Sequence, residues 1–175
     1  MPPTPTLLPK SPIVDTNILF DFLVWRFHTE TQSGIHPSLL DHLSSKPLEE
    51  LKWYLDAAKP IQTAFHVIAE LHGLTKKKTQ KKPEWTSSTR ESYWRFVREE
   101  LSQIELREHP VTIMEMDTEE LAQLGPTDAS ILVLAIRLNA VVLTEDGPLK
   151  DRCTEREIRV LNYDGVSRLW MQSTI

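Results

Sequence analysis

The chain has 175 residues, of which 40% are apolar and 26% are charged, and its formal net charge is −5. This length and composition suit one folded domain spanning residues 1–175 rather than a disordered chain. The net negative charge argues against coating of nucleic acid by bulk positive charge, yet it allows a local carboxylate site with its metal ions. The longest apolar run, at 131–136, is too short to cross a bilayer, so we expect no membrane partner.

Cysteine content and the first residues bear on the cellular compartment. The single cysteine, Cys153, rules out an internal disulfide and a thiolate zinc cluster. The N-terminal residues lack the basic start and apolar stretch of a secretory signal. We therefore expect a cytoplasmic protein, in which the proline-rich residues 1–11 form a flexible N-terminal tail.

Short β-rich runs alternate with longer helical stretches along the chain, which favours an α/β fold with a parallel sheet. Strands are predicted at 12–15, 60–62, 111–116, 140–144 and 158–162. Helices are predicted at 17–27, 36–45, 47–59, 63–78, 88–106, 118–124, 128–139 and 166–171, with a further one between the last two strands. Thr63, Ser88 and Thr127 are the expected capping residues at three of the helix starts.

Four acidic residues stand at positions that suit a site. Asp15 ends the first predicted strand, Asp146 lies just past the strand at 140–144, and Asp128 occupies a first helical turn. Ligands of open parallel sheets bind outside the carboxyl ends of the strands, where such acids would meet. Glu70 lies within a helix among apolar residues, where a carboxylate needs a partner because burying it alone costs several kcal/mol.

Each acid taken alone also has a plain structural explanation, as a helix cap, a first-turn acid, a turn residue or half of an ion pair. Taken together, four converging carboxylates repel one another unless a divalent cation neutralises them. Oxygen ligands alone select Mg²⁺ or Mn²⁺ over zinc. Such ions serve phosphate chemistry by activating water for in-line attack.

Four short motifs resemble those of the PIN domain family and occur in the family's order. They are VDTN at 14–17, AELHGL at 69–74, DASILVLA at 128–135 and LTED at 143–146. The resemblance runs from about residue 13 to residue 163. It implies a parallel five-stranded sheet flanked by helices on both faces, in a three-layer α/β/α arrangement. It also implies a Mg²⁺- or Mn²⁺-dependent endoribonuclease that hydrolyses RNA phosphodiester bonds with a metal-activated water.

The same resemblance assigns roles by position. It gives metal-binding and catalytic roles to Asp15, Glu70, Asp128 and Asp146, and supporting catalytic roles to Asn17 and Thr144. Glu145 adjoins Asp146 on the opposite side of an extended backbone, and the family pattern selects Asp146. Many small PIN proteins are toxins of toxin–antitoxin pairs, so the resemblance is compatible with a cognate antitoxin partner, while the insertions after Phe27 and Gly73 leave a stand-alone RNA-processing enzyme open. The resemblance also implies a homodimer.

Other interpretations remain open. One is a non-catalytic PIN-like module that binds RNA or protein, and another is a phospho-acceptor receiver domain. The Lys-rich segment at 76–87, predicted to be exposed, either contacts an RNA backbone or is a solvated helix end. Its tryptophan, Trp85, is expected to pack rather than to stack on a base.

Overall fold

The computed structural model describes residues 8–31, 39–40 and 44–173 of the chain. Its centre is a five-stranded, all-parallel sheet with the strand order β3-β2-β1-β4-β5. The strands are β1 (Ile13–Val14), β2 (Gln62–Ala64), β3 (Arg107–His109), β4 (Val142–Leu143) and β5 (Val160–Leu161). The predicted α/β class with a parallel sheet is thereby confirmed.

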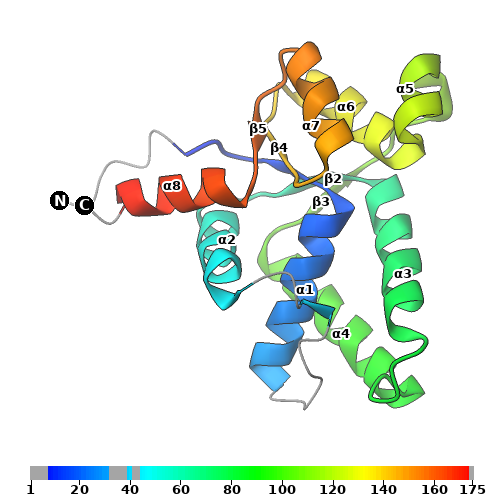
Figure 1. Cartoon of the computed structure of the whole chain (residues 1–175), viewed down its shortest axis with the longest axis vertical. Helices are drawn as coiled ribbons and strands as arrows, with labels where there is room; N and C mark the ends of the chain where they lie inside the picture. Colours follow the sequence, from blue (N-terminus) through cyan, green and yellow to red (C-terminus); the bar gives the residue numbers. More distant parts are fainter. Residues whose placement is uncertain (1–7, 32–38, 41–43, 174–175) are drawn as a thin grey trace.

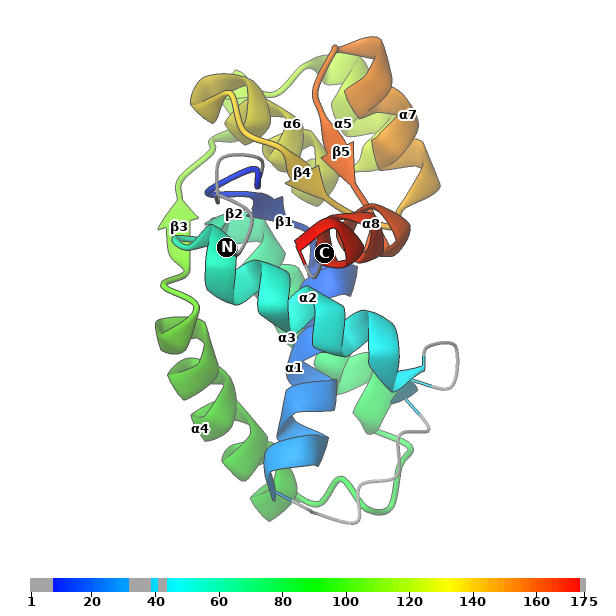
Figure 2. The same ribbon diagram turned by 90° about the vertical axis from the view of Figure 1, so that its left-hand side faces the viewer.

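Helices cover both faces of this sheet, which gives the three-layer α/β/α arrangement that was expected. They are α1 (Thr16–Thr31), α2 (Ser45–Ala58), α3 (Phe65–Thr79), α4 (Ser87–Gln103), the 3-10 turn η3 (Ile113–Glu115), α5 (Thr118–Leu124), α6 (Pro126–Leu138), α7 (Gly147–Glu155) and α8 (Tyr163–Ser173). Figure 1 shows α1 to α4 below the sheet and α5 to α7 above it, and Figure 2 shows α8 lying beside α2. None of the helices within the described ranges has the length and apolarity needed to cross a membrane.

The strand order places a change of direction between β1 and β4. From β1 the chain proceeds outward to β2 and β3 on one side, and it then returns to β4 and proceeds to β5 on the other. Right-handed connections therefore put their helices on opposite faces of the sheet. The connections that leave β1 and β4 diverge, and the crevice between them at the carboxyl edge is where open parallel sheets bind ligands.

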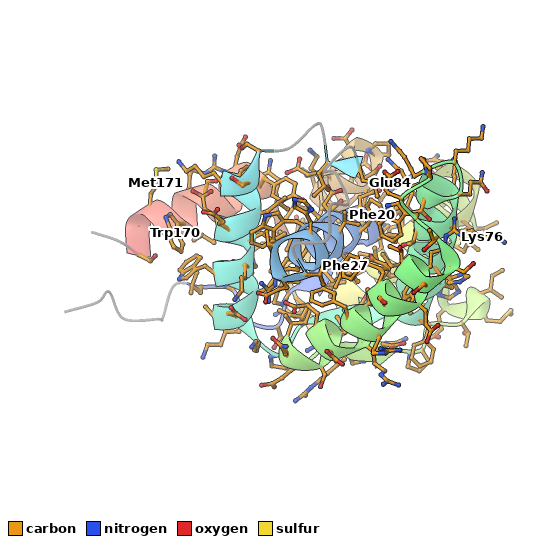
Figure 3. All side chains as sticks on the ribbon, turned by 90° about the horizontal axis from the view of Figure 1, so that it is seen from below. Phe20, Phe27, Lys76, Glu84, Trp170 and Met171 are labelled. Atoms are coloured by element: carbon orange, nitrogen blue, oxygen red, sulfur yellow. The ribbon has the colours of Figure 1, made fainter. Side chains whose placement is uncertain are left out.

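The core is built around α1, whose almost continuous apolar sequence explains its burial between α2, α3 and α4. Near its end, the Phe27 ring lies 6.2 Å from Trp85 and 5.3 Å from Tyr93, measured between centroids. Figure 3 shows Phe27 inside the molecule and Lys76 at its edge. Trp85 is only 2% exposed and packs as predicted, so the segment 76–87 is exposed only in part.

The strand predicted at 111–116 is wrong. The third strand lies earlier, at β3, and residues 113–115 form a 3-10 turn whose Glu115 carboxylate accepts hydrogen bonds from the amide and hydroxyl of Thr112. The apolar residues that favoured a strand, Ile113 and Met114, are exposed to solvent. In contrast, β3 lies at the edge of the sheet and carries exposed polar residues, so it lacks an apolar signal.

The predicted cap of the helix after β2 is also wrong. Thr63 belongs to β2, where its hydroxyl donates to the Val14 carbonyl at 3.3 Å, and α3 begins at Phe65. The second strand therefore lies about two residues later than predicted. The helix predicted at 36–45 falls largely outside the described residues.

Two further helices begin earlier than predicted. The cap of α4 is Thr86, whose hydroxyl oxygen accepts from the Thr89 amide at 3.2 Å, and Ser88 lies inside the helix. Helix α6 begins after Gly125, whose φ of 84° is a conformation that glycine adopts without strain, so Thr127 is not its cap.

Residues 8–11 are not a flexible tail. The Ser11 amide donates to the Ala58 carbonyl at 2.8 Å, and the Tyr54 hydroxyl donates to the Pro9 carbonyl at 3.0 Å. These bonds hold the segment against α2 immediately before β1. The rest of the predicted tail, residues 1–7, lies outside the described residues.

Candidate metal centre

Asp15 is the most constrained of the four predicted acids. It follows β1 directly and is 2% exposed. One carboxylate oxygen accepts from the Ile18 amide at 2.8 Å, which caps α1, and the other accepts from the Thr144 hydroxyl. Burial raises the pKa of Asp15 from 3.8 to about 6, although these two hydrogen bonds oppose the rise and the charges of Asp146 and Asp21 add to it. The carboxyl is therefore fixed in place, and the charges that act on it among the described residues are those of other acids.

Thr144 links Asp15 to the loop that carries Asp146. It is fully buried directly after β4, where its hydroxyl donates to Asp15 and accepts from the Asp146 amide at 2.9 Å. Asp146 in turn accepts from the Leu149 amide at 2.9 Å and so caps α7. The supporting role predicted for Thr144 thus has a direct geometric basis.

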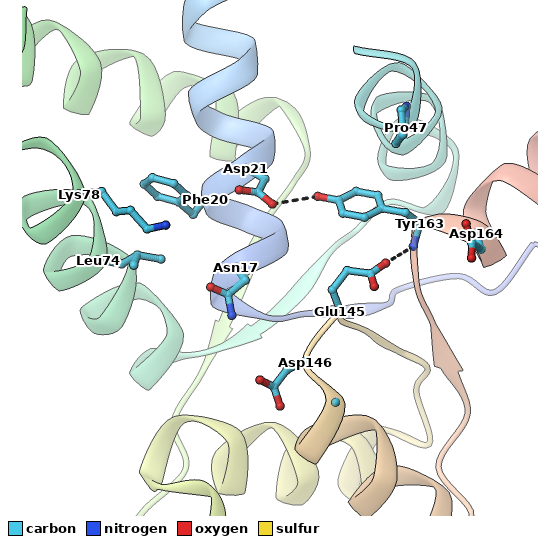
Figure 4. A pocket seen from close by; sticks show the side chains of 11 residues that line it. Asn17, Phe20, Asp21, Pro47, Leu74, Lys78, Glu145, Asp146, Tyr163 and Asp164 are labelled. Carbon is cyan, nitrogen blue, oxygen red and sulfur yellow. Dashed lines mark hydrogen bonds between the residues drawn. The ribbon is translucent and has the colours of Figure 1, made fainter. Parts of the chain in front are cut away.

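Glu145 and Asp146 have different hydrogen-bond partners. One Glu145 oxygen accepts from the Tyr163 amide at 2.6 Å at the start of α8, and the other lies 4.0 Å from the Lys150 ammonium. Figure 4 shows Glu145 turned toward Tyr163, with Asp146 on the side of Asn17. The geometry agrees with the choice of Asp146 as the site residue.

Asp128 lies in the first turn of α6, where the charges of the other three acids act on its carboxyl. Burial raises the pKa of its carboxyl from 3.8 to about 7, and the charges of Asp146, Asp15 and Glu70 contribute to the rise. The residue is half-buried. The four acids come from four separate segments of the chain, and the charge of each of the other three contributes to the raised pKa of Asp128.

Glu70 reaches this group in a different way from the one expected. The predicted apolar setting is wrong because Glu70 lies on an exposed part of α3. Its partner is Thr16, whose hydroxyl donates to a Glu70 oxygen at 2.7 Å. Thr16 is buried next to Asp15, so it holds Glu70 at the end of β1. Sequence reasoning missed this role, for which the only signal is the position of Thr16 after Asp15.

Asn17 and two residues that the sequence did not single out lie on the neighbouring side of the site. Asn17 is exposed and lines a cavity together with Asp146. One turn further along α1, Asp21 is 8% exposed and accepts from the Tyr163 hydroxyl at 3.3 Å (Figure 4). An acid inside the otherwise apolar stretch 17–27 was a signal for Asp21, whereas nothing local pointed to Tyr163.

The donor set suits a hard divalent ion that retains water. All four acids offer oxygen, which favours Mg²⁺ or Mn²⁺. Within the ranges that the structure describes, no three Asp, Glu, His or Cys side chains are arranged closely enough to enclose an ion. Of the four acids, Asp146 lines the cavity, where an ion would keep part of its hydration. Mg²⁺ fits this arrangement because it keeps several waters and binds through one or two carboxylates and substrate phosphates.

Comparison of the sequence with protein-family models and with curated proteins finds no match. The similarity to PIN domains therefore rests on the four motifs and on no wider alignment. At the crevice between β1 and β4, the buried carboxylate of Asp15 and the half-buried one of Asp146 are both held by hydrogen bonds.

Proposed function

We propose that the chain is a metal-dependent endoribonuclease of the PIN type, which hydrolyses RNA phosphodiester bonds with Mg²⁺ or Mn²⁺ as cofactor. One observation carries this proposal: Thr144 joins Asp15 to the backbone of Asp146, and Thr16 joins Glu70 to the end of β1, so hydrogen bonds gather three of the acids at one edge of the sheet. Acids grouped in this way repel one another unless a cation is present. Their oxygen donors and the open cavity beside them suit an ion that also contacts phosphate.

The chain's own residues would orient the acids for this chemistry. The Ile18 amide and the Thr144 hydroxyl fix both oxygens of Asp15, and the Leu149 amide fixes one oxygen of Asp146. Each oxygen keeps a lone pair for a further contact. A divalent ion held by these acids would polarise a water for attack and offset charge on the phosphate.

The alternative is a non-catalytic module that binds RNA or protein. One observation favours it: Asp15 caps α1 and Asp146 caps α7. Both acids therefore have a structural role that requires no ion. The antitoxin partner, the homodimer and the cytoplasmic location remain predictions, and we propose single-stranded RNA as the substrate for the first test.

Cleavage of single-stranded RNA by the wild type and by Asp15→Asn, with Mg²⁺, Mn²⁺ or EDTA, separates the two functions. We expect cleavage by the wild type only with the metals, and a loss of about 100-fold or more in the variant, because metal placement contributes several kcal/mol. The asparagine keeps the size of the side chain and can still accept from Ile18. RNA binding without cleavage in any metal would instead support the non-catalytic module.

A further inference from the structure

A cavity of about 620 Å³ lies next to the candidate metal centre, a size within the range of small-molecule sites. Its lining residues come from α1, α2, α3, the β4–α7 loop and the start of α8. They include the apolar Phe20, Leu74 and Pro47 and the polar Asn17 and Tyr163 (Figure 4). Figure 4 shows Phe20 and Leu74 on one side of the cavity and Glu145 and Tyr163 on the other, so apolar surface is combined with a few polar groups, as is usual in ligand sites.

One face of α3 connects the cavity to the metal centre. Glu70, Leu74 and Lys78 are spaced four residues apart, so they lie on the same side of the helix. Glu70 belongs to the acid group, while Leu74 and Lys78 line the cavity. At a rise of about 1.5 Å per residue, the backbone positions of Glu70 and Lys78 are about 12 Å apart. The face thus presents an acid, an apolar surface and a cation in succession.

The charges around the cavity are separated in space. Lys78 is the one cation among the described lining residues, and its ammonium lies 6.0 Å from the centroid of the Phe20 ring. The acids of the lining are Asp21, Glu145, Asp146 and Asp164, of which Glu145 and Asp164 lie on the side of Tyr163, away from Lys78 (Figure 4). A phosphate group is repelled from the acidic side and attracted to Lys78. Carboxylates, in contrast, accept hydrogen bonds from the N–H and O–H groups of a base or sugar.

We propose that this cavity binds one unpaired nucleotide of RNA beside the cleaved bond, with its phosphate at Lys78 and its base against Leu74. This assignment rests on the proposed function, because it places the cleaved phosphodiester at the metal centre. A nucleotide enters such a cavity only when it is unstacked and unpaired, as in single-stranded RNA. The site therefore selects single strands over duplexes.

The phosphate contact is tested by comparing Lys78→Gln with Lys76→Gln, in binding of a short fluorescent single-stranded RNA with Ca²⁺ in place of Mg²⁺. Lys76 is a matched control because it lies two residues away on the other side of the helix and at the molecular edge (Figure 3). We expect Lys78→Gln to weaken binding about fivefold and to reduce the salt dependence by the equivalent of one phosphate contact, a slope change of about 0.7. Equal behaviour of the two variants would overturn the assignment of Lys78.

The base position is tested by Leu74→Trp, which fills the cavity, with the volume-conserving Leu74→Met as control. We expect the tryptophan to weaken single-strand binding at least fivefold while the salt slope stays unchanged, because no charge is altered. Thermal melting verifies that both variants are folded. If Leu74→Trp binds like Leu74→Met, no nucleotide occupies the cavity.

The outcomes for the cavity and for the nuclease are distinct. Binding that depends on Lys78 and Leu74, without metal-dependent cleavage, retains the nucleotide site and rejects the nuclease. Cleavage by the wild type that is insensitive to both residues retains the nuclease and rejects the nucleotide site. A wild type that binds no single-stranded RNA rejects both.

Discussion

Replacing Asp146 with asparagine is expected to lower metal-dependent RNA cleavage by about 100-fold or more, whereas Glu145→Gln keeps it within about threefold of the wild type. The two acids are neighbours in sequence but differ in their partners. Both line the cavity, but it is the charge of Asp146 that raises the pKa of Asp15 and of Asp128. Glu145 accepts from the Tyr163 amide, and glutamine retains an oxygen for that bond.

The measurement is the initial rate of single-stranded RNA cleavage at saturating Mn²⁺, with folding verified by thermal melting. The glutamine variant is the matched control because it removes the same charge from the same loop. In Asp146→Asn the new side-chain oxygen can still accept from the Leu149 amide, so α7 keeps its cap. Equal losses in the two variants would mean that loop charge in general, rather than Asp146 itself, supports cleavage.

Replacing Arg26 with methionine is expected to lower the free energy of unfolding by about 3–5 kcal/mol. Arg26 makes two bonds with the Glu100 carboxylate, at 2.8 and 3.2 Å, and a third with Glu30 at 2.6 Å. Glu100 is 3% exposed, so removal of its partner leaves a buried and uncompensated charge between α1 and α4. Urea denaturation measures the loss.

Two controls define this prediction. In the double variant with Glu100→Leu, both charges are removed and most of the stability should return, because an apolar pair can replace a buried ion pair. Lys52→Met breaks the solvent-accessible pair with Asp56 on α2 and should cost less than about 1 kcal/mol. An Arg26→Met variant as stable as Lys52→Met would show that Glu100 is not desolvated in solution.

The sequence predicts best what is encoded locally. Strands β1 and β4 are buried in the middle of the sheet, so they are apolar, and the acids that follow them were found at their ends. The edge strand β3 is largely exposed and polar, so its sequence did not indicate a strand. The nearby apolar residues Ile113 and Met114 did, although they are exposed to solvent. The apolar sequence around Glu70 was equally misleading, because that residue lies on the open side of α3.

Contacts between distant residues could not be predicted from local patterns. Thr16 and Glu70 are 54 positions apart, and Asp21 and Tyr163 are 142 positions apart. Such pairs follow from the packing of α1 against α3 and from the path of the chain after β5. Only the fold shows that Thr16 holds one of the acids or that Glu145 faces α8.

The pH dependence of the site follows from its two raised pKa values. Asp15 and Asp128 titrate with pKa values of about 6 and about 7, above their ordinary value of 3.8. Without metal, these two groups lower the free energy of unfolding as the pH rises, because their ionisation is unfavourable in the folded state. Their contribution is fully favourable below about pH 4 and is lost as the pH rises through 6 to 7. A bound cation favours the ionised form and reverses this penalty. Metal affinity should therefore increase over the same interval.

Calorimetric titration of the protein with Mn²⁺ tests most directly whether the four acids form a metal site. We expect binding at pH 8, weaker binding at pH 5.5 with release of protons, and loss of most of the affinity in Asp128→Asn at both values. Absence of binding at pH 8, or equal affinities of the wild type and Asp128→Asn, would contradict a metal site formed by these acids.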